Sequence, residues 1–140
     1  MSIKKIIILL LSVIYSSWSI AQDGGLLERV AQTQGFFLFY SASCPHCQRF
    51  APQLKQFSDH YGFKIVAISV DGGYLPSFPD AVMDSGQKHS FGVNLLPSLF
   101  LVDPARQKVA LVTEGAVDNE ELSERLIKIM KLQNKETIDE

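Results

Sequence analysis

The stretch FFLFYSASCPHCQRFAP, residues 36–52, joins an apolar run to a pair of cysteines. Residues 36–40 are continuously apolar and aromatic, which is typical of a strand buried on both faces. Ser43 can cap a following helix, and Pro45 suits its first turn because proline has no N–H to leave unpaired. The sequence therefore predicts a strand that passes directly into a helix, with Cys44 at the junction.

That helix should continue to about residue 61, because apolar residues recur at intervals of three and four. They form one stripe along the helix: Cys47, Phe50, Leu54, Phe57 and Tyr61. Pro52 falls inside the helix and should kink it. Gly62 is the expected C-terminal residue that ends it.

The spacing of Cys44 and Cys47 favours a reactive site over a structural one. A disulfide between them closes so short a loop that it restricts the unfolded chain very little. The N-terminus of a helix instead concentrates free N–H groups and positive potential, which stabilise a thiolate on Cys44. A protonated His46 would add to this effect, and the more buried Cys47 would resolve a mixed disulfide from inside.

Three other uses of the cysteine pair stay open. A c-type haem site needs a histidine directly after the second cysteine, where this chain has Gln48. A structural zinc site needs four ligands, and besides the two cysteines the chain offers only His46, His60 and His89. A purely structural disulfide gains little from so short a loop. The spacing favours a redox dithiol over all three, with no metal and no cofactor.

The rest of the chain alternates strands and helices. The predicted elements are a leading helical turn at 26–31, strands at 64–70, 98–103 and 108–113, a short helix at 84–90, and a helix capped by Asp118 and frayed after Gln133. Parallel strands joined by helices and followed by a hairpin give an α/β fold. We expect a mixed central sheet flanked by helices on both faces.

Residues 1–21 have the pattern of a cleaved signal peptide. Lys4 and Lys5 precede an apolar run that is short for a membrane span, and Ser19-Ile20-Ala21 has the small residues that signal peptidase requires. Residues 22–140 then form one domain with 11 basic against 15 acidic residues, a net charge of −4. This charge argues against nucleic-acid binding. The expected product is a periplasmic protein with no stable membrane insertion after cleavage.

The sequence resembles the thioredoxin superfamily over about residues 34–131. The resemblance rests on CPHC at a strand–helix junction, on Ala51-Pro52, and on Phe91-Gly92-Val93 ahead of Pro97. It implies a cis proline at Pro97 beside the dithiol, with the Leu96 backbone pairing with an extended substrate. Leu38 stands where thioredoxins carry a buried acid, which puts efficient reductase activity in doubt.

The chain also resembles the TraF/TrbB-type proteins of F-type conjugative pilus assembly. This resemblance covers residues 36–63, the sequence ISVDGG at residues 68–73 and the proline-containing loop that follows. This likeness implies a thiol–disulfide oxidoreductase or isomerase that acts on exported cysteine-containing proteins. Its catalytic residues would be Cys44, Pro45, His46 and Cys47. A redox partner protein is expected, and the chain should be monomeric.

Two alternatives to this enzyme remain. One is a redox-silent binding or assembly factor with a thioredoxin-like groove, and the other is a membrane-tethered thiol reductant. Outside the cysteine pair, Asp71-Gly72-Gly73 is interpreted as turn chemistry that lies near the substrate groove. His60 and His89 are expected to be solvated helix residues.

Overall fold

The structure of the protein is a computed structural model that describes residue 3 and residues 18–139. The predicted signal peptide therefore lies mostly outside the described residues. The elements in chain order are α2 (Trp18–Ala31), β1 (Gly35–Tyr40), α3 (Pro45–Tyr61), β2 (Ile65–Ser69), β3 (Val82–Met83), α4 (Gln87–Ser90), β4 (Ser98–Asp103), β5 (Lys108–Glu114) and α5 (Asn119–Ile138).

The strands form one mixed sheet in the order β3-β2-β1-β4-β5. β1 and β2 are parallel, as are β2 and β3, while β4 lies antiparallel to both β1 and β5. The predicted mixed sheet is confirmed. The two-residue strand β3 was not predicted, because Val82 and Met83 are too few to produce a periodic pattern.

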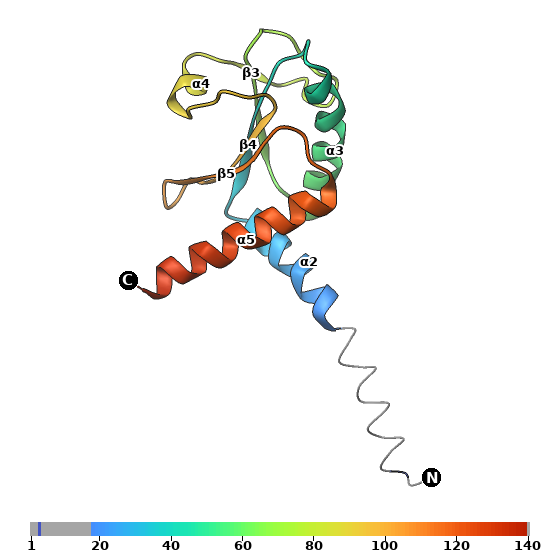
Figure 1. The fold of residues 1–140 in the computed structure, drawn as a ribbon, viewed down its shortest axis with the longest axis vertical. Coiled ribbons are helices and arrows are strands. Elements are labelled where there is room, and N and C mark those ends of the chain that lie inside the picture. Colours follow the sequence, from blue (N-terminus) through green and yellow to red (C-terminus); the bar gives the residue numbers. More distant parts are fainter. Residues whose placement is uncertain (1–2, 4–17, 140) are drawn as a thin grey trace.

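Helices cover the two faces of the sheet unequally (Figure 1). One face packs against α2, α3 and α5 through a large cluster that includes Leu27, Leu54 and Leu122. A smaller cluster on the other face contains Phe39, Ile68, Val93 and Phe100, on the side of the sheet where α4 lies. The expectation of helices on both faces is therefore correct, with most of the core on the α3 side.

α3 carries the first functional residues and follows its sequence pattern closely. Pro45 occupies the first turn, and Gly62 ends the helix in the left-handed conformation at φ 87°. The predicted stripe is buried at Cys47, Phe50, Leu54 and Phe57, and half-buried at Tyr61. Pro52 lies inside the helix, which continues for nine further residues to Tyr61.

Three helix boundaries differ from the predictions. α4 begins at Gln87 instead of residue 84. α2 is a helix of 14 residues rather than a single turn. α5 is capped by the Asp118 carboxylate, which accepts from the Glu121 N–H at 2.8 Å as predicted, but the helix continues to Ile138 instead of fraying after Gln133. Distant contacts hold this last part: Gln133 bonds to Gln34 at 3.2 Å, and Glu136 lies 3.5 Å from Lys108.

Candidate active site

The dithiol lies where β1 gives way to α3. β1 ends at Tyr40, and after a three-residue loop Cys44 is the N-cap residue of α3. The Cys44 carbonyl accepts from the Gln48 N–H at 3.0 Å, which begins the helical hydrogen bonding. Its side chain makes no capping bond, so the sulfur is left at the helix N-terminus, where the positive end of the helix dipole lies.

Ser43, the predicted cap of this helix, does not cap it. The Ser43 hydroxyl instead lies 2.9 Å from the Ser41 hydroxyl and donates to Asp71 at 3.3 Å. The prediction was wrong because a carboxylate from the end of β2 competes for the serine. The cap position falls to Cys44, one residue later.

The two thiols differ in acidity. Burial alone raises the pKa of Cys44, but the Cys47 N–H, the Cys47 thiol, the His46 N–H and the charge of Arg49 together hold that pKa below its ordinary value. Burial raises the pKa of Cys47 to about 12, opposed by a backbone hydrogen bond at Ser41 and reinforced by the Cys44 sulfur. The pair therefore consists of a partly accessible thiol that ionises easily and a buried one that does not.

This difference predicts selective alkylation of the reduced protein. At pH 8, Cys44 should react with iodoacetamide, whereas Cys47, with a pKa of about 12, is ionised in only about one molecule in ten thousand. Peptide mass mapping after a short pulse should find the label on Cys44 alone. Equal labelling of both cysteines in the folded protein would contradict the acidities described above, and labelling in denaturant gives the control.

Arg49 brings a positive charge that the sequence prediction assigned to His46. A guanidinium nitrogen of Arg49 lies 2.9 Å from Nδ1 of His46. Because arginine only donates hydrogen bonds, Nδ1 of His46 accepts in this contact. Arg49 was not predicted to act at the site, because an arginine two residues after Cys47 in the sequence has the pattern of an ordinary solvated helix residue.

The opposite wall of the site comes from the loop before β4. The Leu96–Pro97 peptide bond is cis, as the superfamily resemblance implies. The Cys44 thiol lies 4.0 Å from the Leu96 carbonyl oxygen, and Leu96 packs against both hydrophobic clusters. The structure thus brings together residues 44 and 96, which are 52 positions apart in the chain.

Asp71, two residues after the end of β2, organises the loop that leads to Cys44. Its carboxylate accepts from the Ser41 hydroxyl at 2.7 Å, from the Ala42 N–H at 3.1 Å and from the Ser43 N–H at 3.3 Å. It also accepts from the Gly73 N–H at 3.1 Å. These bonds, led by the one from Ser41, hold the pKa of Asp71 well below its usual range.

The turn after Asp71 must come close to the same loop. A Cβ atom at Gly73 would lie 2.5 Å from the Cβ of Ala42, so only glycine fits. The Gly73 carbonyl accepts from the Tyr40 hydroxyl at 3.1 Å and from the Ser69 hydroxyl at 2.6 Å. The Asp-Gly-Gly sequence is therefore turn chemistry, as predicted, and it is also a support of the dithiol loop.

Leu38 is buried, at 1% exposure, where thioredoxins carry an acid. Burial is the main cause of the raised pKa of Cys47, and the charge of Asp71 adds to it. Asp71 is itself too acidic to take a proton from that thiol at neutral pH. The surroundings of Cys47 therefore keep its thiol protonated at neutral pH.

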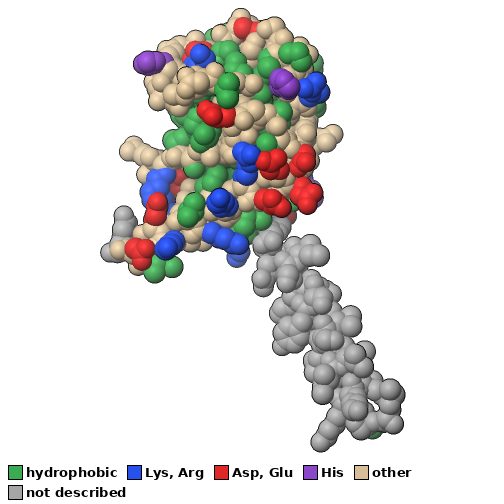
Figure 2. All heavy atoms as spheres, in the orientation of Figure 1, with side chains coloured by type: hydrophobic (Ala, Val, Ile, Leu, Met, Phe, Trp, Pro, Cys, Tyr) green, Lys and Arg blue, Asp and Glu red, His purple; other side chains and the backbone are tan. Residues whose placement is uncertain are grey.

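Most of the charged side chains on the visible face lie over its lower part, near α5, and fewer lie at the upper end (Figure 2). Tyr74 and Leu95, close in sequence to Asp71 and Leu96, are exposed apolar side chains. Among the described residues, no three histidine, cysteine or acidic side chains form a group that would hold a metal ion. None of the helices α2 to α5 has the length and apolar character needed to cross a membrane.

The chain is similar to known proteins over most of its length. Residues 11–127 match TraF, the family described as the F plasmid transfer operon protein. The chain belongs to the TraF family. It is 29% identical over 109 residues to the TraF protein of Escherichia coli (strain K12), aligned over 78% of this chain and 44% of that protein. The TrbB protein of the same organism is 32% identical over 85 residues, which are 58% of this chain and 47% of TrbB.

This TraF-family chain therefore spans about half the length of these two relatives.

Solved structures of other proteins share the fold of this chain. StoA from Bacillus subtilis matches with a TM-score of 0.53 at 20% identity, over 67% of this chain and 82% of StoA. Thioredoxin from Aeropyrum pernix matches with a TM-score of 0.52 at 22% identity, over 76% and 82%. At these identities the likeness shows the fold, which is the thioredoxin fold predicted from the sequence.

Proposed function

We propose that this protein is a periplasmic thiol–disulfide oxidoreductase or isomerase that acts on exported cysteine-containing proteins. The observation that carries the proposal is the placement of the two thiols: Cys44 is the N-cap residue of α3 and lies 4.0 Å from the Leu96 carbonyl oxygen, and Cys47 is buried inside the helix. The lowered pKa of Cys44 and the raised pKa of Cys47 agree with this placement. Membership of the TraF family supports a role in assembling a conjugative transfer apparatus. The periplasmic location rests on the signal peptide predicted at residues 1–21.

In the oxidising direction the disulfide form of the pair is attacked at Cys44 by a substrate thiolate. The first product is a mixed disulfide, and Cys47 takes up a proton as it leaves. A second substrate thiolate then attacks the substrate sulfur and releases Cys44 as a stable thiolate, a good leaving group. Two electrons pass from the substrate to the dithiol, and a redox partner protein must remove them.

In the isomerising direction the reduced protein starts the reaction. The Cys44 thiolate attacks a misplaced substrate disulfide, and a different substrate thiolate displaces Cys44, so no electrons are gained or lost overall. Reduction requires Cys47 to attack, and its pKa of about 12 makes that step slow. The acidities therefore support oxidation or isomerisation more than reduction.

Substrate binding is proposed along the loop before β4. The Leu96 carbonyl, beside the Cys44 sulfur, is available to an extended substrate backbone, and Pro97 fixes the direction of this loop. Pro45 begins α3 without an N–H that would need a partner. His46 is exposed between the cysteines and would add positive charge to the site when it is protonated.

The test is a pH titration of thiolate absorbance combined with a glutathione redox equilibrium. Cys44 should titrate well below the ordinary value of about 8.5, and in any case below pH 8. Because a stabilised thiolate stabilises the reduced form, the reduction potential should lie above the roughly −270 mV of thioredoxin and towards the roughly −120 mV of DsbA. Titration above pH 8 together with a potential as low as that of thioredoxin would contradict the proposal.

Two variants separate the sources of charge in the same titration. Arg49→Gln should raise the Cys44 midpoint, because it removes a positive charge that lowers the pKa of that thiol. His46→Ala should raise the midpoint as well, because it removes an imidazole from the N-terminal turn of α3 and the contact that this ring makes with Arg49. An unchanged midpoint in His46→Ala would show that the imidazole does not act on the thiolate.

A further inference from the structure

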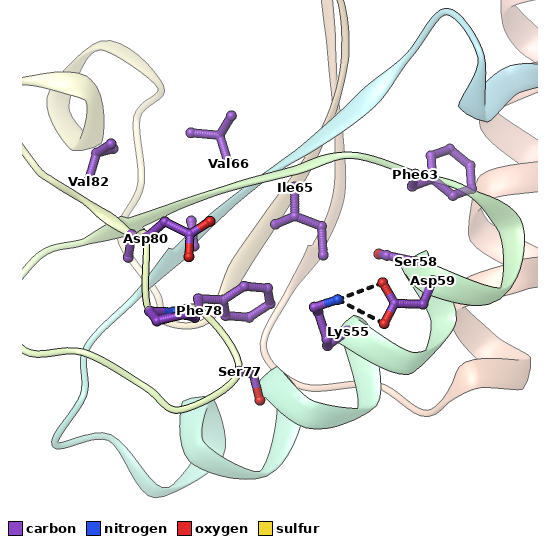
Figure 3. Close-up of a pocket in the computed structure, with 13 residues that line it drawn as sticks. Lys55, Ser58, Asp59, Phe63, Ile65, Val66, Ser77, Phe78, Asp80 and Val82 are labelled. Carbon is purple, nitrogen blue, oxygen red and sulfur yellow. Dashed lines mark hydrogen bonds and ion pairs between the residues drawn. The ribbon is translucent and has the colours of Figure 1, made fainter.

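A second hollow lies at the far end of β2 from the dithiol. It is a pocket of about 440 Å³ between α3, the first half of β2 and the loop at residues 77–82 (Figure 3). The parallel register places Ile65 beside Phe36, at the start of β1, whereas Ser69 lies beside Tyr40 and the dithiol loop. The lining residues include none of the dithiol site.

The pocket contains a buried hydroxyl that has no partner. Ser58 in α3 is 1% exposed, and its Oγ makes no hydrogen bond within the described part of the chain. Its backbone carbonyl is already engaged by the N–H groups of Gly62 and Phe63. Figure 3 shows the hydroxyl pointing from α3 towards the Ile65 side of the pocket. A buried polar group left unpaired costs free energy. The Oγ is itself shielded from solvent, so this hydroxyl belongs to the wall of the pocket and does not contact an occupant.

The neighbouring edge of the sheet is open. β3 pairs only with Ile68 and Ser69, so the first three residues of β2 have no strand on their outer side. The Lys64 carbonyl accepts from β1, whereas the Ser69 carbonyl accepts from Asp84 on the outer side. Since successive residues of a strand face opposite edges, Ile65 and Ala67 share the outward direction of Ser69. Their backbone groups are available to an extended peptide.

The charges in the pocket favour a basic occupant. Lys55 is neutralised by Asp59, whose two oxygens lie 2.6 and 2.8 Å from its Nζ. Asp80 has neither an ion pair nor a side-chain hydrogen bond among the described residues, and Figure 3 shows its carboxylate above Phe78. Ile65 and Phe78 form apolar walls between these charged groups.

We propose that this pocket docks an extended, basic segment of a partner protein. The segment adds a strand to the open edge of β2 through the backbone of Ile65 and Ala67. The stem of one lysine or arginine lies against Ile65 and Phe78, and its charged end pairs with Asp80. This site goes beyond the proposed function, because it would hold a partner without using the dithiol.

The probe is the capped peptide acetyl-Thr-Val-Lys-Val-Thr-amide, titrated into ¹⁵N-labelled full-length protein. Chemical shifts should change at residues 65–67 and 77–82 and stay constant at Cys44 and Leu96. Norleucine in place of the lysine keeps the stem and removes the charge, and should weaken binding about two- to fivefold. Two further peptides carry an N-methyl group either on the lysine or on each valine, which removes the N–H groups facing one edge of the added strand. Since successive residues face opposite edges, only one of these peptides loses its hydrogen bonds to β2, and that peptide should not bind.

Protein variants test the contact with Asp80. Asp80→Asn should weaken binding about two- to fivefold and remove its salt dependence. Ser58→Ala should leave both binding and the melting temperature unchanged, because its hydroxyl is unpaired and shielded from the occupant. Glu28→Gln, an exposed carboxylate change on α2, should leave binding unchanged. Cys44→Ser should also bind normally, which separates this test from that of the dithiol.

Several results would overturn the proposal. They are no shift changes at millimolar peptide, changes centred on Cys44 and Leu96, or equal binding of the lysine and norleucine peptides. Concentration-dependent shifts at residues 65–67 without peptide would assign the edge to a second copy of the chain instead.

Discussion

Replacing Cys44 with serine is expected to reduce disulfide exchange to the uncatalysed rate. The Cys44 sulfur is the atom that attacks or is attacked in both proposed directions, and the buried Cys47, with its pKa of about 12, cannot substitute for it. The measurement is the rate at which a reduced, and separately a scrambled, disulfide protein regains activity with catalytic amounts of this protein.

Cys47→Ser should instead trap substrates on the protein as mixed disulfides. The Cys44 thiolate still attacks a substrate disulfide, but no internal thiol resolves the product, so mixed disulfides should accumulate on non-reducing gels. The double serine variant is the matched control and should trap nothing. If Cys44→Ser supported conjugative transfer as well as the native protein in cells, the binding or assembly role would replace the enzyme.

Asp71→Ala is expected to lower both stability and activity, although Asp71 never touches the reacting sulfur. The substitution leaves the N–H groups of Ala42 and Ser43 and the Ser41 hydroxyl without their shared acceptor. Water replaces part of this bonding because Asp71 is exposed, so the free energy of unfolding should fall by about 1–2 kcal/mol. Urea unfolding at pH 7 measures the loss, and the exchange assay measures the effect of a displaced loop.

The stability effect of Asp71 should depend on pH in a defined direction. Its pKa lies lower in the folded protein than in the unfolded chain, where it is about 3.9. The stabilisation is therefore fully present above about pH 4 and is lost as the pH falls further. The stability difference between the native protein and Asp71→Asn should narrow below pH 4. A constant difference from pH 7 to pH 3 would mean that the carboxylate charge does not stabilise the loop.

The features that the sequence predicted correctly depend on nearby residues. The junction of β1 with α3 follows from a short apolar run, a proline in the first turn and a helical stripe ending at Gly62. The capping of α5 by Asp118 follows from a contact three residues away. The position of Leu96 beside Cys44 came from the family resemblance alone, because no local pattern links residues 52 positions apart.

The features that could not be predicted from local sequence depend on contacts between residues far apart in the chain. Asp71 takes Ser43 away from its expected capping role, and Gln34 and Lys108 hold a helical end that a charged composition would leave frayed. One signal was available for Asp71. Since the ends of neighbouring parallel strands meet at one edge of a sheet, a polar residue two positions after β2 is expected near the residues after β1.

The bonds from Asp71 span 28 to 30 positions of the chain, and the contact of Cys44 with Leu96 spans 52. The dithiol loop thus has high contact order although its motif is only four residues long. A nascent chain that ends before β2 holds both cysteines without the carboxylate that shapes their loop, and one that ends before β4 holds them without the opposite wall. The cysteines reach their final arrangement only after most of the sheet has been synthesised and paired.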